Sequence, residues 1–410
     1  MPILINGLKL LDRSDSSVDY YMQDNGEHIL VACGEVHLQR CVKDLEVTFA
    51  KIPITISKPI VSFRETVMEG GKTFSAITAN KRIQIIATAY PLPENLIEFL
   101  EFNFEILKKI FTSKNTQTSE KKNFVSNLAE KLTSCENKLQ NIILNYLIGF
   151  GPKRVGCNLL AYMGCSGFKD IENDIETIEI DIQSENSSTN TSKISSNDYD
   201  IKETLRVGFD CAANAGPLCA EPLRGVCIVV EEIKYIEEEI RDIYGPFQGQ
   251  MISTMQEVCK SAVLGNSPRL VEGMYICTFT TTQEYIGKLY TVISKRRGKI
   301  LEEMLTEGTD LFVCKAYLPV VESFGFAEEL RRMTSGLVLP QLVFSHWETM
   351  FDNPFYIRKT VEEMEEFGDQ PVLDNLPKTF INKVRRRKGL QTDEKLVIHA
   401  DKQRTLTKMR

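Results

Sequence analysis

Short runs of glycine, lysine and hydroxyl residues are the first candidates for chemistry in this sequence. Gly70-Gly71-Lys72-Thr73 matches the end of a phosphate-binding loop, in which backbone N–H groups, a lysine and a hydroxyl hold phosphate and Mg²⁺. That motif also needs a glycine five positions before Gly71, where Thr66 stands. Asn80-Lys81 lacks the aspartate, two residues further on, that contacts a guanine base. We therefore predict no catalytic residue and no cofactor in this chain.

Histidine, cysteine and carboxylate residues do not gather at the spacing of metal ligands. The four histidines lie in unrelated segments, as His28, His37, His346 and His399. The eleven cysteines include no Cys-x-x-Cys pair, and their odd number fits reduced thiols better than a disulfide framework. No apolar run approaches the roughly 20 residues of a membrane helix. We expect a cytoplasmic protein without a metal site or a membrane partner.

Two clusters of cations have the type and density to contact phosphate groups. Lys295-Arg296-Arg297 precedes Gly298 at the predicted end of a helix, where the backbone can approach a ligand closely. Alternatively, these cations only stabilise the C-terminal end of the helix by interacting with its dipole. Arg385-Arg386-Arg387-Lys388 forms the second cluster.

The second cluster lies in a strongly basic tail. From Lys378 to Arg410 there are eleven Lys and Arg against three Asp and Glu, so the tail carries +8 and the rest −15 of a net −7. Such asymmetry suggests an anionic partner for this end, although a solvated basic helix would also explain it.

The elements around the first cluster follow one another in a regular order. Apolar runs predict strands over Arg269 to Thr280, Ile300 to Leu305, Leu311 to Leu318 and Leu339 to Trp347. Helical spacing of apolar residues predicts helices over Tyr285 to Ile293 and Phe326 to Met333. The order β-α-β-β-α-β predicts a ferredoxin-like module over residues 266–348.

Residues 1–56 repeat this order without its first strand. Two extended segments flank the hairpin turn Asn25-Gly26, a helix follows from Gly34 to about Phe49, and Ile52 to Ile56 is predicted to return as a strand. A sheet without its edge strand exposes unpaired backbone groups. We therefore expect either that another part of the protein supplies the edge or that the sequence is a fragment.

Residues 57–265 are predicted to form a less regular α+β domain with inserts near 112–122 and 170–198. Asp170 to Glu185 has seven acidic residues and no basic one, and Asn186 to Asn197 is almost wholly Ser, Asn and Thr, a composition typical of disorder. Helices are predicted from Leu96 to Ile110, up to about Leu147, and from Met251 to Val263. Residues 349–410 are predicted to be an extension whose basic helix packs back on this domain.

Several motifs at these boundaries resemble the ribosomal translocase family that includes elongation factors 2 and G. The N-terminal motifs are Gly26-Glu27-His28, Gly34-Glu35-Val36-His37-Leu38-Gln39-Arg40-Cys41 and Phe63-Arg64-Glu65-Thr66. The later ones are Glu322-Ser323-Phe324-Gly325-Phe326, Thr334-Ser335-Gly336, Pro340-Gln341 and His346-Trp347. The resemblance covers nearly the whole chain apart from the two inserts. Phe344-Ser345-His346-Trp347-Glu348 and Lys402-Gln403-Arg404-Thr405-Leu406 are most similar to the elongation factor-like GTPases of large-subunit maturation.

The resemblance implies the third, fourth and fifth domains of such a GTPase, with a ribosomal-S5-like α+β domain between two ferredoxin-like modules. GTP and Mg would belong to a nucleotide-binding domain outside this sequence. The resemblance also implies three partners: the large ribosomal subunit with its rRNA, the Shwachman-Bodian-Diamond syndrome protein, and an anti-association initiation factor that GTP-dependent action releases.

The same resemblance assigns roles to individual residues. Gly34, Glu35, His37 and Leu38 would face the GTPase domain. The residues expected to bind the ribosome are Lys295, Arg296, Arg297, Ser323, Phe324, Phe326, Arg385, Arg386, Arg387 and Lys388. Aromatic rings can stack on exposed bases, but core packing is the expected fate of at least one of Phe324 and Phe326.

The tip of the fourth domain separates two branches of the family. In the translocase this loop carries a histidine that is modified to diphthamide, whereas no histidine occurs from Glu231 to Gln250. The residues predicted to form the tip are Glu237, Glu238, Glu239, Tyr244 and Phe247. Three consecutive glutamates would be repelled by nucleic-acid phosphates. A maturation GTPase is therefore favoured, and the alternatives are a translocase and a stand-alone ribosome-binding module.

Overall fold

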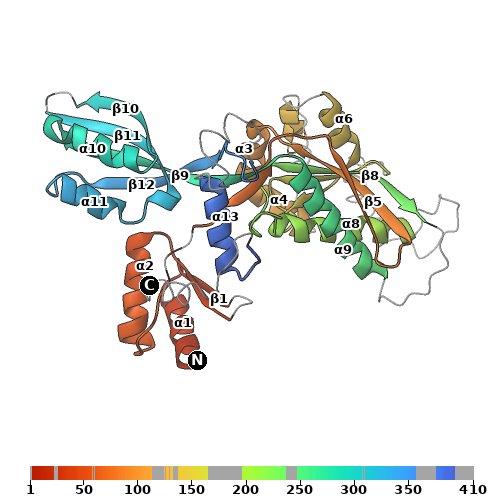
Figure 1. Cartoon of the computed structure of the whole chain (residues 1–410), viewed down its shortest axis with the longest axis horizontal. Coiled ribbons are helices and arrows are strands. Elements are labelled where there is room, and N and C mark those ends of the chain that lie inside the picture. Colours follow the sequence, from red (N-terminus) through yellow and green to blue (C-terminus); the bar gives the residue numbers. More distant parts are fainter. Residues whose placement is uncertain are drawn as a thin grey trace, which may run out of the picture. The chain divides into compact units, whose positions relative to one another are not determined.

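The computed structural model describes residues 2–22, 26–57, 59, 61–112, 124, 126–128, 130–132, 137–164, 196–236, 247–306, 308, 310–356 and 375–392. It divides into two compact units. The first comprises Met1–Val61, Gly273–His346 and Thr379–Arg410, and the second Ser62–Glu272 and Trp347–Lys378. Helices and several sheets occur in both (Figure 1), so the fold is of the mixed α+β class. Within the described residues, no helix has both the length and the apolar character that crossing a membrane requires.

The N-terminal part of the first unit is two helices packed on a hairpin. Its elements are α1 (Pro2–Ser14), β1 (Asp19–Met22), β2 (His28–Val31), α2 (Glu35–Asp44) and the π-helical turn η1 (Leu45–Phe49). β1 and β2 pair antiparallel with Tyr20 opposite Leu30, as the hairpin prediction requires, and the turn residues 23–25 lie outside the described part. Apolar side chains close the core, namely Leu8, Leu11, Val18, Cys41, Leu45 and Ala50.

The strand predicted from Ile52 to Ile56 is not present. Residues 51–57 form no regular element, although Ile52 and Ile54 pack against the core. The strand prediction from alternating apolar residues is therefore wrong, because no described strand of the two-stranded β1–β2 sheet takes this segment as a neighbour, and the last of its isoleucines, Ile56, is exposed.

The remaining elements of the first unit build a larger sheet with helices on one face. They are β9 (Pro268–Thr282, which begins in the second unit), α10 (Gln283–Lys295), β10 (Lys299–Leu305), β11 (Leu311–Pro319), η2 (Val320–Glu322), α11 (Phe326–Met333) and β12 (Pro340–Thr349, which ends in the second unit). The strand order is β10-β11-β9-β12. Leu289 and Ile293 of α10 and Leu330 of α11 pack on Phe279 and Ala316 of the sheet. The order of elements is the predicted one.

A basic helix, α13 (Leu376–Arg387), follows near the C-terminus. Phe380, Ile381 and Val384 are its buried face, and its residues from Thr379 onward belong to the first unit. Within that unit the Phe380 ring faces the guanidinium of Arg297, 5.6 Å away. The predicted packing of this helix on residues 57–265 stays a prediction.

The second unit is built on a five-stranded sheet. Its strands, in spatial order, are β4 (Thr73–Ile77), β5 (Ile83–Pro91), β8 (Val226–Tyr235), β7 (Asn158–Tyr162) and β6 (Leu147–Gly151). β7 and β8 run parallel, and the other neighbours are antiparallel. A further strand, β3 (Arg64–Val67), pairs with the first residues of β9.

Helices cover both faces of this sheet. α8 (Ser196–Asn214) and α9 (Phe247–Gly265) lie on one face, and α3 (Glu94–Phe102), α4 (Phe104–Thr112) and α6 (Asn137–Tyr146) on the other. Ile228 of β8 belongs to the first core and its neighbour Val229 to the second. Because successive side chains of a strand point to opposite faces, a strand buried on both sides needs the continuous apolar run found here.

One helix prediction in this unit needs correction. The single helix expected from Leu96 to Ile110 is two helices, because Asn103 leaves the helical conformation and its side chain donates to the Phe99 carbonyl. The helix expected to reach about Leu147 ends at Tyr146, as predicted, and β6 begins at the next residue. Residues 113–123 and 165–195, which hold most of both predicted inserts, lie outside the described part, and α8 begins at Ser196.

A buried carboxylate organises the loop at residues 216–221. Glu65 Oε2 accepts the N–H of Leu218 at 2.8 Å, and its Oε1 accepts those of Cys219 and Glu221. Burial raises the pKa of Glu65, while these N–H donors lower it. A Cβ on Gly216 would lie 2.3 Å from Glu65 Oε2, so only glycine fits there. Glu65 of the Phe63–Thr66 motif thus has a structural role.

Candidate functional site

The first cation cluster lies where α10 ends. Arg296, Arg297 and Gly298 donate their N–H groups to the last carbonyls of the helix, two of them to Ile293. Arg297 has φ of 58°, the left-handed conformation that usually falls to glycine at a helix C-terminus. Gly298 is required next to it, because a Cβ there would lie 2.5 Å from the Ile293 side chain. The sequence signal for the helix end is therefore correct, with arginine in the left-handed position.

Arg296 forms hydrogen bonds with the neighbouring loop, Glu322 to Phe326. Its Nη1 donates to the carbonyls of Glu322 and Phe324, the latter at 2.8 Å, and its Nε donates to Glu329 at 2.9 Å. The guanidinium also lies 5.6 Å from the centre of the Phe326 ring. A guanidinium group carries five N–H donors in one plane, so the single side chain of Arg296 can make all these contacts. Arg296 therefore orders the segment from Glu322 to Phe326.

Two carboxylates partly neutralise the cluster. Glu329 accepts from Lys295 at 2.8 Å as well as from Arg296, and these two cations lower the pKa of Glu329 to about 2. Arg297 lies 3.8 Å from Glu322. Lys295 has 70% of its side chain exposed, against 15% for Arg296. Of the three predicted phosphate contacts, Lys295 is thus the one turned most fully to solvent.

The two aromatic residues of the loop differ in environment. Phe326 is completely buried and meets Phe279 edge-on, with ring centroids 6.0 Å apart. Phe324 is half-buried. Ser323 is buried, and its hydroxyl donates to the Val320 carbonyl. A ring inside the core cannot stack on an external base, so we retain Phe324 as a candidate contact and assign Phe326 to holding the loop.

The start of α2 carries the residues predicted to face a GTPase domain. Gly34 is exposed and Leu38 half-buried, and Glu35 Oε2 accepts the N–H of Gly325 at 2.9 Å within the first unit. The loop between Glu322 and Phe326 is therefore held by two side chains, Arg296 at its carbonyls and Glu35 at one N–H.

His37 forms a hydrogen-bonded group with Asp15. Its Nδ1 accepts the N–H of Cys33 at 3.1 Å, so the neutral ring carries its proton on Nε2, which lies 2.8 Å from Asp15 Oδ2. The N–H of Ser17 and this imidazole lower the pKa of Asp15. Ligand atoms of Asp15, His37 and Cys41 lie within 4.8 Å of one another. Because a metal would need the Nε2 lone pair, the geometry favours the hydrogen bond.

The second cation cluster forms the last turn of α13 and the residue after it. Arg386 is exposed and Arg385, Arg387 and Lys388 are half-buried. Arg385 Nε donates to the Gln391 carbonyl at 2.7 Å, and Gly389 takes positive φ to end the helix. Cations at this end interact favourably with the helix dipole. Their placement suits helix stability and an anionic partner equally.

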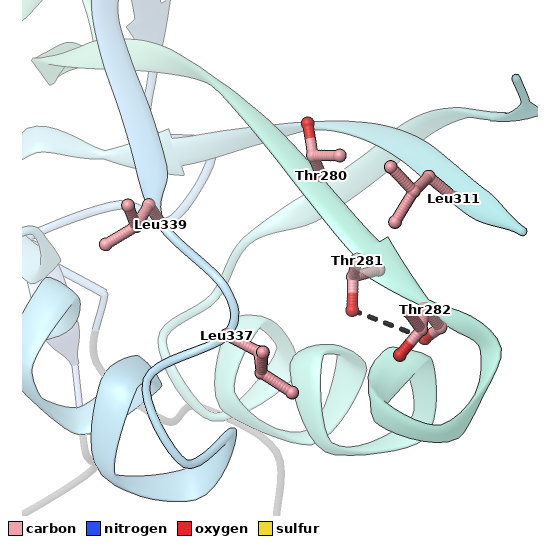
Figure 2. A pocket seen from close by; sticks show the side chains of 6 residues that line it. All are labelled: Thr280, Thr281, Thr282, Leu311, Leu337 and Leu339. Atoms are coloured by element: carbon pink, nitrogen blue, oxygen red, sulfur yellow. Dashed lines mark hydrogen bonds between the residues drawn. The ribbon is translucent and has the colours of Figure 1, made fainter. Parts of the chain in front are cut away.

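A shallow pocket of about 340 Å³ opens beside the end of β9. Figure 2 shows its lining residues, three threonines in succession at the end of β9 (Thr280, Thr281 and Thr282) together with Leu311, Leu337 and Leu339, and Thr281 donates to the Thr282 carbonyl. None of these described side chains is an acid or a base, so no lining residue could activate a threonine hydroxyl as a nucleophile.

The predicted tip of the middle domain lies almost wholly outside the described part. Glu237, Glu238, Glu239 and Tyr244 fall there, as does the Lys402 to Leu406 motif. Phe247 begins α9, and its side chain is not described. The structure leaves the tip prediction as it stands.

Comparison with known proteins relates these arrangements to a family. Residues 269–357 match the elongation factor G C-terminus, and residues 88–162 match an elongation factor-like GTPase 1-like domain. Human Elongation factor-like GTPase 1 is 34% identical over 501 residues, which cover 100% of this chain and 44% of that protein. The chain is a homologue of this GTPase. The resemblance seen in the motifs is thereby confirmed.

Two fungal relatives match the chain over a similar extent. Ribosome assembly protein 1 of Schizosaccharomyces pombe is 34% identical over 440 residues, covering 98% of this chain and 42% of that protein. Its counterpart in Saccharomyces cerevisiae is 33% identical over 442 residues, covering 100% and 38%. The chain thus spans less than half the length of the curated relatives it matches.

Sequence reasoning missed the acidic partners of the cation cluster. Glu329 lies in the first turn of α11, a place where the helix dipole alone favours an acidic residue. It is 33 residues from Arg296 in sequence. Only the β-α-β-β-α-β order, which brings both helices to one face of the sheet, could have signalled the pairing.

Proposed function

We propose that this chain is the ribosome-binding part of a translational-type GTPase that acts in cytoplasmic maturation of the large ribosomal subunit. The observation that carries the proposal is the match of residues 88–162 to the elongation factor-like domain, together with relatives named for ribosome assembly along the whole chain. Residues 88–162 contain α3, α4 and α6, which cover one face of the central sheet.

Our proposal includes a finer fold and mechanism. Residues 266–348 would be a ferredoxin-like domain five, residues 1–56 a truncated domain three, and residues 57–265 a ribosomal-S5-like domain four. With the Shwachman-Bodian-Diamond syndrome protein, the whole GTPase would release an anti-association initiation factor, using GTP and Mg held by another domain. The strand order β10-β11-β9-β12 supports the first assignment.

The proposed ribosome-facing surface of the first unit centres on the loop from Glu322 to Phe326. Arg296 orders its carbonyls, Phe324 is half-buried beside them, and Lys295 is largely exposed. In this proposal Lys295 contacts rRNA phosphates, and Arg296 keeps the loop in a fixed shape. Glu35, which accepts from Gly325, would connect that loop to the segment that faces the GTPase domain.

Complementation in yeast tests the assignment. The complete coding sequence should restore growth to cells lacking ribosome assembly protein 1 and should fail to replace elongation factor 2. The opposite pattern would show a translocase. Sedimentation of the 410-residue chain with purified subunits tests the partner: we expect it to accompany the large subunit in preference to the small one.

A further inference from the structure

The turn between β6 and β7 in the second unit departs from the residues that its geometry favours. The N–H groups of Val155 and Gly156 donate to the Pro152 carbonyl at 3.2 and 3.1 Å, so Lys153 and Arg154 are the two central residues of a β-turn. Both have positive φ, of 56° and 63°. Turns with positive φ at both centres favour Asn-Gly, because larger side chains are strained there.

Neighbouring groups enforce this conformation. A Cβ on Gly156 would lie 2.0 Å from the Gly151 carbonyl oxygen, so glycine is required to close the loop. Asp210 of α8 faces the backbone N–H groups of Arg154 and Lys153; burial raises the pKa of Asp210, and these N–H groups offset part of the rise. Strained backbone persists only where the surroundings impose it, and such strain clusters at ligand-binding sites.

Both side chains are directed to solvent. Lys153 is exposed, and Arg154 keeps 53% of its side chain exposed while it pairs with Glu203. Glu203 also lies 3.5 Å from Arg206, so one carboxylate serves two arginines. With Asp210 counted, three cations face two carboxylates. Among these described groups the turn therefore presents a net positive charge, and neither of its two exposed side chains fills the core.

We propose that the Lys153-Arg154 turn binds phosphate groups of an RNA backbone. Lysine offers a point charge and arginine a fork of donors, and contacts of this kind position a protein on RNA without reading its sequence. The choice of RNA over an acidic protein rests on the proposed function, which places the chain on an RNA-rich particle. In this proposal, the two strained residues lower the stability of the chain and are kept because their side chains bind RNA.

The experiment compares stability with affinity. Replacing Lys153→Asn with Arg154→Gly supplies the residues that the turn favours, so the melting temperature should rise. Binding of the full chain to a fluorescein-labelled RNA hairpin should weaken about threefold to tenfold, and the slope of log affinity against log salt should fall by about 2. A second variant, Lys153→Gln with Arg154→Gln, should lose the same affinity without the gain in stability.

The control removes two adjacent exposed cations of the same unit, Lys108→Gln and Lys109→Gln on α4. It should change the salt slope by much less. An equal loss of RNA affinity in the control, or unchanged RNA binding by the turn variants, would overturn the proposal. So would turn variants that lose binding to polyglutamate but not to RNA. A fall in melting temperature for the Asn-Gly variant would also overturn it. Because the probe is a free RNA, the result does not depend on ribosome maturation.

Discussion

Among the described residues of the second unit, Arg224 is the cation most completely removed from water. Its side chain is 6% exposed and reaches two carboxylates, Glu94 at 2.6 Å and Glu101 at 2.9 Å. These hydrogen bonds raise the pKa of Arg224 although burial lowers it. Both glutamates are more than a third exposed and can return to solvent if the arginine is removed.

We therefore expect Arg224→Ala to destabilise the second unit by about 2–3 kcal/mol, below the cost of breaking a fully buried pair. Arg224→Lys should cost less, because it keeps the charge but loses the planar fork. The only tryptophan of the sequence, Trp347, belongs to this unit and can report its urea unfolding. Equal stability of Arg224→Ala and the unmodified chain would contradict the prediction.

Glu329 gives the first unit a defined pH dependence. Its pKa of about 2 lies below its ordinary value of 4.5, so the charged form is favoured by folding. The resulting stabilisation is complete above pH 4.5 and is lost as the pH falls from 4.5 towards 2. Scanning calorimetry should show that Glu329→Gln melts at a lower temperature than the unmodified chain at pH 7.

That difference between the two proteins should shrink as the pH falls from 4.5 towards 2, since the stabilisation by a charged Glu329 is lost as the carboxylate of the folded chain is protonated. Glu328→Gln, on the exposed neighbour, is the matched control and should shift the melting temperature little at either pH. A difference that stays constant with pH would mean that the ion pairs of Glu329 with Lys295 and Arg296 add no charge-dependent stability.

Among the elements, α13 is the one whose charge and packing can be separated by mutation. Phe380, Ile381 and Val384 bury one face, while the cations from Arg385 to Lys388 follow at its end. Changing these four cations to Gln should leave the fold intact and weaken binding to large subunits. The slope of log affinity against log salt should fall by up to about 4. Filter binding across a salt series measures this.

A control with the same change in charge carries Gln at exposed cations elsewhere, namely Lys9, Arg13, Lys51 and Lys108. If the control and the α13 variant weaken binding equally, total charge and not this helix determines affinity. If neither does, the cluster serves only the helix dipole.

The elements themselves were largely predictable from periodicity. Long apolar repeats gave α9, β9 and β11 at nearly their observed positions, because burial and period act together there. The errors fall where tertiary structure decides. Ile52 to Ile56 is apolar at alternate positions, yet no described strand pairs with it, and a helix ends at Asn103, whose side-chain hydrogen bond to Phe99 the spacing does not reveal.

The candidate site was harder to predict than the elements. The type and place of Lys295 and Arg296 suggested phosphate contacts, but Glu329, which pairs with both, is contributed by another helix. Lys153 and Arg154 gave no signal, since nothing in a Pro-Lys-Arg sequence announces positive φ at both centres. Pairing between distant segments and backbone strain are properties of the folded chain.

At the scale of the whole molecule, the candidate phosphate-binding loop lacks the surroundings that a nucleotide site requires. The nearest candidate, Gly70 to Thr73, would need to lead from a strand into a helix to cradle phosphates. Here Thr73 instead begins β4. The N–H of Lys72 donates to Asn266 Oδ1 at 3.1 Å, and Asn266 Nδ2 donates back to the Lys72 carbonyl. The backbone that would bind phosphate is already bonded to Asn266.

We therefore predict that the 410-residue chain alone neither binds nor hydrolyses GTP. Phosphoryl transfer needs a backbone cradle, a lysine and a magnesium-binding hydroxyl together, whereas here Thr73 begins a strand and the N–H of Lys72 is bonded to Asn266. Titration with a fluorescent GTP analogue and Mg²⁺ should give no saturable signal, and Lys72→Ala should leave the titration unchanged. Saturable binding in the micromolar range, abolished by Lys72→Ala, would place a nucleotide site in this chain. It would contradict the proposal that GTP and Mg are held by another domain.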